Sequence, residues 1–275
     1  MSFNIILNST NDIDPQNNSI YRYQFSNGNF KINEGSEICV SQIQIPYSWY
    51  NISSFYNNNT VQFISWLGVT YNITFPDGFY TFADLQNYME LFMINNGLYL
   101  INNGINVYYF SMYSNQNLYK NQFLFYPVPT SLPTGGFTQP ANFVGYPVST
   151  IAPRFVVLNN NFVTYSGFNA ATYGGGAVAS SVLSQNVPVG STVNSLLISC
   201  NLVDNSVGFP SDILDILQID SSFGTNINYE PKFQKWVKIK AGTYNSLIIN
   251  FRDQNNNQIR ILDPNLTISL LLKNK

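Results

Sequence analysis

Short segments in which apolar and polar residues alternate run along most of the chain, and Gly, Pro, Asn and Asp separate them. A period of two residues is typical of β-strands that bury one face, and the separating residues are typical of turns. The clearest segments come last, at 196–203, 247–252 and 266–272, and we expect them to be central strands. Earlier strands are predicted at Thr60–Leu67, Val69–Phe75, Val107–Met112, Gln122–Val128 and Arg154–Leu158.

One apolar segment changes its alternation half-way. Ile38 and Val40 share one face of a strand, whereas Ile43 and Ile45 fall on the opposite parity. A β-bulge inserts one extra residue and turns the following side chains to the other face. We therefore predict a bulge near Ser41-Gln42 that brings all four side chains into the core.

Helical spacing is convincing only at Thr81–Asn96. Thr81 and Asp84 form a capping-box pattern, apolar residues recur at helical spacing after it, and Asn95-Asn96-Gly97 ends the segment. A second, shorter helical turn is predicted after Pro210, through Asp215-Ile216-Leu217. The fold class is therefore an all-β sandwich with one short helix.

The length of 275 residues suits one large β domain, because all-β sandwiches reach this size as a single unit. We expect an N-terminal arm at residues 1–17 and one domain at 18–275. A long loop region is expected at 130–193, which is rich in Pro, Gly, Ser, Thr and Ala. Its Gly174-Gly175-Gly176 run lacks the Lys-Ser/Thr ending of a phosphate-binding loop.

Charge is the most unusual feature of the composition. Charged residues make up 9% of the chain, against about 25% in an ordinary soluble domain, and aromatic residues make up 16%. An AT-rich genome would raise Asn, Ile, Tyr and Phe, but it would also raise Lys, and Lys and Arg together number only 12. Interface cores are depleted of charge and rich in Tyr and Phe, so we favour a surface covered by permanent neighbours.

A net charge of −2, with no basic cluster beyond Lys232 to Lys240, indicates no direct nucleic-acid binding. The start, Met1-Ser2-Phe3-Asn4, lacks the features of a signal peptide, and no apolar run approaches the roughly 20 residues of a membrane span. We expect the protein to be made and kept in the cytosol. Cys39 and Cys200 are then expected to be buried free thiols.

The chain contains no histidine, which removes the commonest general base and metal ligand. Two of the carboxylates Asp204, Asp212, Asp215 and Asp220 could bind Ca²⁺ or act as acid and base in a glycosidase. The alternative is a helix N-terminus, in which Ser211 and Asp212 are ordinary first-turn residues. We favour the alternative and expect no catalytic residue, no cofactor and no metal.

Two apolar segments are candidates for subunit contacts. Tyr47, Trp49 and Tyr50 could form a sugar-binding platform, but such clusters more often fill an interface or a core corner. The N-terminal residues Phe3, Ile5 and Leu7 could add a strand to a neighbouring subunit's sheet, or could belong to the first strand of their own sandwich. Both interpretations of the N-terminal segment remain open.

The order of several short motifs resembles the penton, or minor capsid, proteins of virophages and related Polinton-like viruses. In the first half these are Gly35–Val40, Ile43–Ile52 and Phe75–Thr81, the last similar to the family's P-x-G-x-Y-T turn that leads into a helix. In the second half they are Leu196–Asn205, Pro210–Leu214, Gly242–Tyr244 and Phe251–Asp253 through Asp263–Leu266. The resemblance covers roughly residues 20–125 and 194–273, and residues 130–193 match nothing in it.

The resemblance implies a single jelly roll of about eight strands in two sheets. It further implies homopentamers at the vertices of an icosahedral virion, assembled in the host cytoplasm beside a major capsid protein of the double-jelly-roll type. An alternative is a receptor- or carbohydrate-binding β-sandwich of a fibre or spike. A fibre head is usually a trimer on a stalk, and the chain shows no stalk or coiled-coil repeat.

Overall fold

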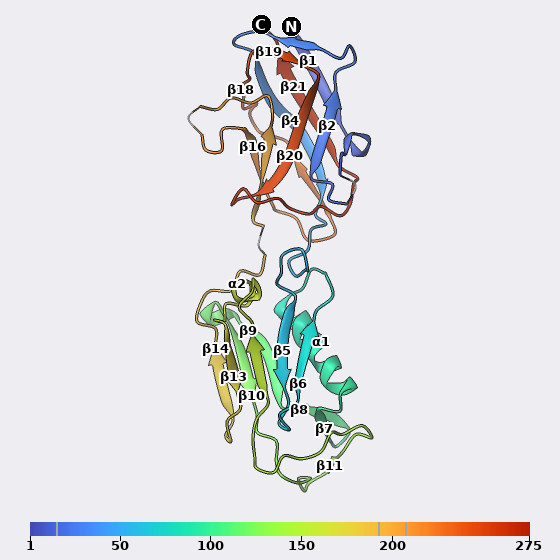
Figure 1. Cartoon of the computed structure of the whole chain (residues 1–275), viewed down its shortest axis with the longest axis vertical. Coiled ribbons are helices and arrows are strands. Elements are labelled where there is room, and N and C mark those ends of the chain that lie inside the picture. The colour runs from blue at the N-terminus through green and yellow to red at the C-terminus, as the bar shows by residue number, and fades with distance from the viewer. Residues whose placement is uncertain (15, 192, 207) are drawn as a thin grey trace. The chain divides into compact units, whose positions relative to one another are not determined.

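A computed structural model describes residues 1–14, 16–191, 193–206 and 208–275. Pro15 of the expected N-terminal arm and Thr192 of the expected loop region lie outside the described residues. Nearly all regular elements are strands, so the prediction of an all-β chain is confirmed (Figure 1). The chain divides into two compact units: unit 1 comprises Met1–Trp49 and Val193–Lys275, and unit 2 comprises Tyr50–Thr192.

Unit 1 is built from two antiparallel sheets. The first has the strand order β1-β21-β4-β17, with the short β18 also paired to β4, and the second has the order β16-β15-β20-β2. A separate ribbon joins β19 to β3. The strands of unit 1 are β1 (Ser2–Leu7), β2 (Ile20–Gln24), β3 (Phe30–Ile32), β4 (Glu37–Pro46), β15 (Ser195–Cys200), β16 (Ile213–Gln218), β17 (Asn226–Tyr229), β18 (Val237–Lys238), β19 (Gly242–Tyr244), β20 (Ser246–Asp253) and β21 (Thr267–Lys273).

The strand pairing of unit 1 is nested from the ends of the chain inward. Strand β1 pairs with β21, β2 with β20, β4 with β17 and β15 with β16, all antiparallel. Two further pairings, β21 with β4 and β20 with β15, join these pairs into two four-stranded layers. A long hairpin rolled in this way is the jelly roll. The predicted fold is therefore confirmed in unit 1.

Alternation of side chains builds the core of unit 1. In β20, Leu247, Ile249 and Phe251 are buried and their neighbours in the strand are half-buried, except for the terminal Asp253. The pairing of β21 with β4 shifts register so that Ser269 lies opposite Gln42 and Leu270 opposite Val40, which leaves Ser41 as the extra residue. The predicted bulge is therefore present, and the four isoleucine and valine side chains around it are buried.

Unit 2 is inserted between β4 and β15 and carries three small sheets. Their strand orders are β13-β12-β5-β6, β14-β10-β9 and β11-β7-β8. The elements of unit 2 are β5 (Thr60–Ile64), β6 (Thr70–Thr74), α1 (Phe82–Asn95), β7 (Tyr99–Asn102), β8 (Ile105–Tyr108), β9 (Phe110–Asn115), β10 (Lys120–Phe125), β11 (Phe137–Thr138), β12 (Arg154–Val157), α2 (Phe162–Ser166), β13 (Ala171–Gly174) and β14 (Ser180–Leu183), with short 3-10 turns at Ser9–Asn11 in unit 1 and Gln116–Leu118 in unit 2.

Residues 18–275 were expected to form one domain. The structure divides them between the two units. Residues 52–168 supply a separate core made largely of Phe, Met, Leu and Val side chains, which is why unit 2 is compact by itself. The expected loop region 130–193 contains α2 and four short strands. Segments such as Ala171–Gly174 and Ser180–Leu183 have only four residues each, too few for a clear alternation of apolar and polar residues to predict them.

Helix α1 follows the sequence prediction and is the longest helix of the described residues. The Asp84 backbone N–H donates to Thr81 Oγ1 at 3.2 Å, and the Thr81 N–H donates to Asp84 Oδ2 at 2.7 Å. Gly97 follows in the left-handed region (φ +64°), where an added Cβ would lie 1.9 Å from the carbonyl oxygen of Asn142. In the part of the chain that is described, neither helix has both the length and the apolar character needed to cross a bilayer.

The second helical turn, predicted after Pro210, is wrong. Residues Ile213–Gln218 form strand β16, which pairs with β15. Leu214 and Leu217 are both buried, and their spacing of three fits a helix face. In the strand, a register shift leaves Leu214 as the extra residue, so that both leucines turn inward.

Both cysteines are buried and free, as predicted. Burial raises the pKa of the Cys200 thiol to about 12 and also raises that of Cys39. Because the thiolate is the reactive form, we expect native protein at pH 8 to react with a thiol reagent only slowly. Denatured, unreduced protein should release the full two equivalents. Rapid reaction of the native protein, or fewer than two thiols after denaturation, would contradict this expectation.

Candidate interaction surfaces

The N-terminal strand lies in the sheet of its own unit. Strand β1 pairs with β21 from Ser2 opposite Lys273 to Leu7 opposite Ile268. Ile5 and Leu7 point into the core and are buried, and Phe3 is half-buried on the same face. Of the two interpretations left open by the sequence, the structure shows the second, a first strand of the chain's own sandwich.

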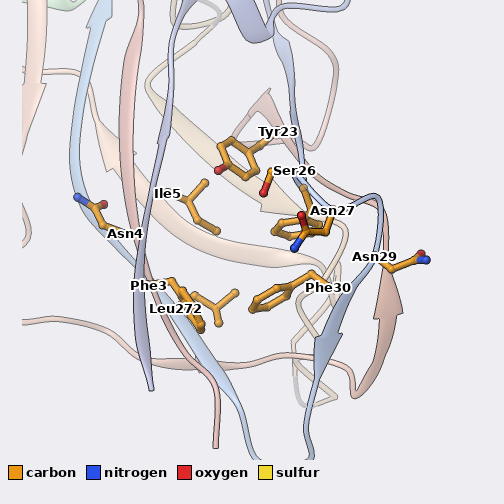
Figure 2. A pocket seen from close by; sticks show the side chains of 10 residues that line it. Phe3, Asn4, Ile5, Tyr23, Ser26, Asn27, Asn29, Phe30 and Leu272 are labelled. Carbon is orange, nitrogen blue, oxygen red and sulfur yellow. The ribbon is translucent and has the colours of Figure 1, made fainter.

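Phe3 and Ile5 line a cavity at the edge formed by β1 and β2, which we call the aromatic pocket. It has a volume of about 260 Å³ (Figure 2). Figure 2 shows Phe3 and Leu272 on one side and Phe30 on the other. The lining residues are Phe3, Asn4, Ile5, Tyr23, Phe25, Ser26, Asn27, Asn29, Phe30 and Leu272.

Ring contacts fix the wall of the aromatic pocket. Phe30 meets Phe3 edge-to-face with ring centroids 5.2 Å apart and stacks on Phe25 at 4.9 Å. Tyr23 meets Phe25 at 5.7 Å. None of the described lining residues carries a charge. The polar groups among them are asparagine amides, the hydroxyl of Ser26 and the phenol of Tyr23. Such a pocket suits an uncharged apolar group, and the polar side chains at the rim of the pocket can stay in contact with water.

A second apolar surface of unit 1 lies over β16 and β15. We call it the aliphatic patch and define it as Leu197, Phe209, Pro210, Ile213 and Ile216. These residues line a shallow cavity of about 530 Å³, whose remaining lining residues, Asn205, Gly208, Gln254, Asn255 and Asn256, are also uncharged. Phe209 is 101% exposed, so its whole side chain projects into solvent.

A third cavity near β16 is charged. It has a volume of about 820 Å³ and includes Asp220, Glu230, Lys232 and Lys235 in its lining. The low charge expected of interface surfaces is thus found at the aromatic pocket and the aliphatic patch but not at this cavity. A polar contact between β16 and β17 lies beside this cavity.

Asp215 is the centre of that contact. Its buried carboxylate accepts hydrogen bonds from Lys235 Nζ at 2.8 Å and from the Tyr229 hydroxyl at 2.7 Å. The hydrogen bond to Asp215 raises the pKa of Lys235, and burial raises the pKa of Tyr229. The buried carboxylate of Asp215 therefore has two hydrogen-bond partners within unit 1.

The four aspartates considered for catalysis have mostly structural partners. Asp212 forms an ion pair with Arg252 at 3.4 Å, and Asp220 accepts a hydrogen bond from Ser221 at 3.3 Å. The backbone N–H of Asp204 donates to the Lys238 carbonyl. Among the described residues, no group of three or more His, Cys, Asp or Glu side chains could hold a metal ion. Asp212 and Asp215 therefore each have a cationic partner within unit 1.

Tyr47 and Trp49 lie in the core of unit 1 and form no exposed platform. Their rings stack at 4.4 Å, Phe223 meets Tyr47 at 5.7 Å, and Trp49 is 1% exposed. Tyr50, in unit 2, is half-buried. Of the six candidate interface residues, the structure brings together Phe3 and Ile5 at the aromatic pocket. A contact of any of the six with a neighbouring subunit stays a prediction.

No protein-family model matches the sequence, and no curated protein matches it. Among solved structures, the chain is similar to the crystal structure of the mavirus penton protein, with a TM-score of 0.47, 10% identity, and coverage of 100% of this chain and 99% of the other. It is also similar to a chain of the Sputnik virophage structure from cryo-electron microscopy, with a TM-score of 0.38, 10% identity, and coverage of 100% and 98%.

Proposed function

We propose that this protein is a structural subunit of an icosahedral virus particle, and that five copies form each vertex. The observation that carries the proposal is the pair of uncharged apolar surfaces on different edges of one jelly roll. Exposed apolar surfaces of this kind mark interaction sites. The motif order that resembles penton proteins of virophages and Polinton-like viruses supports the same role.

A closed ring explains why the two surfaces differ. In a ring of identical subunits each copy contacts the next through two different surfaces, whereas a two-fold dimer uses one surface twice. The aromatic pocket and the aliphatic patch differ in shape and in residues, so they suit the first arrangement. The particle would also contain a major capsid protein of the double-jelly-roll type as a second partner, and the protein would be found in virions after assembly in the host cytoplasm.

The mass of the purified protein in native buffer tests the proposal. We expect a species of five times the chain mass of 31.1 kDa, measured by native mass spectrometry over a range of concentrations. A trimer would instead support the head of a fibre or spike that binds a receptor or carbohydrate. A monomer at all concentrations would contradict both assemblies.

A further inference from the structure

We propose that Phe209 of one copy inserts into the aromatic pocket of the next copy, and that this contact closes the ring. The inference rests on the proposed function, because it requires a ring of identical subunits. It goes further by naming the two surfaces that meet and the side chain that joins them. The occupant of the pocket is thus a second copy of this chain.

The strand order places the two surfaces where a ring needs them. In the sheet β16-β15-β20-β2, the aliphatic patch lies over the edge strand β16 and over β15, whereas β2, which leads into Phe25 of the pocket, forms the other edge. Three interstrand steps of about 4.8 Å separate these edges by roughly 14 Å. One subunit can therefore bind a neighbour at each edge, which is the head-to-tail arrangement of a closed ring.

Shape distinguishes the side chain that inserts from the pocket that receives it. Phe209 projects fully into solvent, whereas the aromatic pocket is a cavity of about 260 Å³ with Phe3, Phe25 and Phe30 in its wall. An aromatic ring that enters such a wall gains edge-to-face or stacked contacts beyond the area that it buries. The aliphatic patch around Phe209 supplies further uncharged surface for the same neighbour.

Charge explains why Phe209 is a better candidate than Phe233 for insertion into the aromatic pocket. Phe233 is 83% exposed, but it lines the charged cavity together with Glu230, Lys232 and Lys235. Burying that region against an uncharged pocket would remove water from charged groups without giving them partners. The lining of both the aromatic pocket and the cavity beside Phe209 is uncharged among the described residues, so their contact carries no such cost.

Phe209 would act as the anchor of a larger interface. A phenylalanine side chain buries about 150–250 Å², whereas a stable interface buries about 800 Å² on each partner. Alanine replacement of a central aromatic anchor typically weakens a contact about 30-fold or more. We therefore expect Phe209→Ala to raise the concentration at which rings dissociate by at least about 30-fold, and Phe209→Asp to abolish rings.

The Ser26→Glu variant tests the pocket that receives Phe209, because it places a charge on an exposed residue at the rim of the aromatic pocket. We expect this variant also to be monomeric. Phe233→Ala is the matched control, because it removes an exposed phenylalanine of the same unit and should leave the rings intact. Far-UV circular dichroism of each variant confirms that the fold is retained.

Mixing the two defective variants gives the sharpest outcome. The Phe209→Asp variant keeps an intact pocket and the Ser26→Glu variant keeps an intact Phe209, so an equimolar mixture should form a dimer of one copy of each and no ring. Sedimentation velocity or native mass spectrometry distinguishes these species. A mixture that stays monomeric would contradict the pairing of these two surfaces.

The remaining outcomes separate the inference from the proposed function. If the unmodified protein forms pentamers and either Phe209→Asp or Ser26→Glu also does, the inference is overturned and the pentamer stands. If the unmodified protein is monomeric at all concentrations, the proposed function fails first. Equal loss of rings with Phe233→Ala would also overturn the specific role of Phe209.

Discussion

Replacing Phe123 by alanine is expected to lower the free energy of unfolding of unit 2 by about 3–5 kcal/mol. Phe123 is fully buried, and its ring stacks on Phe168 with centroids 3.7 Å apart. Phe155 and Phe110 lie at 5.0 and 5.7 Å from the same ring. Truncation would therefore leave a cavity that several rigid rings cannot refill, which is the condition under which such a substitution costs most.

The effect should be confined to unit 2, because the core of unit 1 is built from other residues. Hydrogen exchange measured by mass spectrometry should show faster exchange at residues 50–191 and unchanged exchange in β20 and β21. Tyr113→Ala in the adjacent strand β9 is the control, because Tyr113 is an exposed residue and its loss should change stability by only about 0.5 kcal/mol. Equal loosening of both units by Phe123→Ala would contradict their independence.

Elements with a strong local signal could be predicted from the sequence. The three segments expected to be central strands are β15, β20 and β21, and each has a partner strand on both sides. Helix α1 carried its own capping box, and the change of parity between Val40 and Ile43 located a bulge. Each of these signals comes from neighbouring residues, so no knowledge of the tertiary fold was needed.

The division into two units was not visible in the sequence. The chain passes from unit 1 into unit 2 between Trp49 and Tyr50, inside a run of aromatic residues with no Gly, Pro or charged linker. The two cores differ in composition, since unit 1 buries mainly Ile and Leu and unit 2 mainly Phe, but this difference appears only once the buried residues are known. The partners of β4 and β15 had to be known before the intervening residues could be assigned to a second core.

The candidate surfaces depend on tertiary contacts in a similar way. Phe3 and Ile5 were proposed because they belong to an apolar N-terminal segment, but the other walls of the aromatic pocket, Tyr23, Phe25 and Phe30, come from β2, β3 and the residues between them. Phe209 differed in no sequence feature from the many other phenylalanines of the chain. Its exposure depends on the course of the chain between β15 and β16, which no local pattern encodes.

Low overall charge was the sequence feature that first indicated an assembly, and the structure shows that charge is unevenly distributed. The third cavity contains Asp220, Glu230, Lys232 and Lys235, whereas the lining of the aromatic pocket is uncharged. The uncharged surfaces are thus confined to certain parts of the sandwich. A low average charge could therefore not have shown which edge of the sandwich meets a neighbour.

Deleting residues 1–14 is expected to unfold unit 1 or to bring it close to unfolding. The deletion removes β1 and leaves one side of β21 without its partner strand. It also removes the buried side chains of Ile5 and Leu7, each of which stabilises the fold by about 1.5–3 kcal/mol. The resulting loss of about 3–6 kcal/mol is a large part of the 5–15 kcal/mol that typical proteins possess.

Urea unfolding followed by tryptophan fluorescence measures this loss, in a background with Trp66→Phe and Trp236→Phe so that Trp49, in the core of unit 1, is the remaining tryptophan. Ile6→Thr is the matched control, because Ile6 belongs to the same strand but points outward and is 54% exposed, so its midpoint should hardly change. The opposite result has a definite meaning. If the shortened protein keeps its urea midpoint but no longer assembles, β1 contributes to a neighbour's sheet in the particle, and the intersubunit arm expected as one alternative from the sequence would be correct.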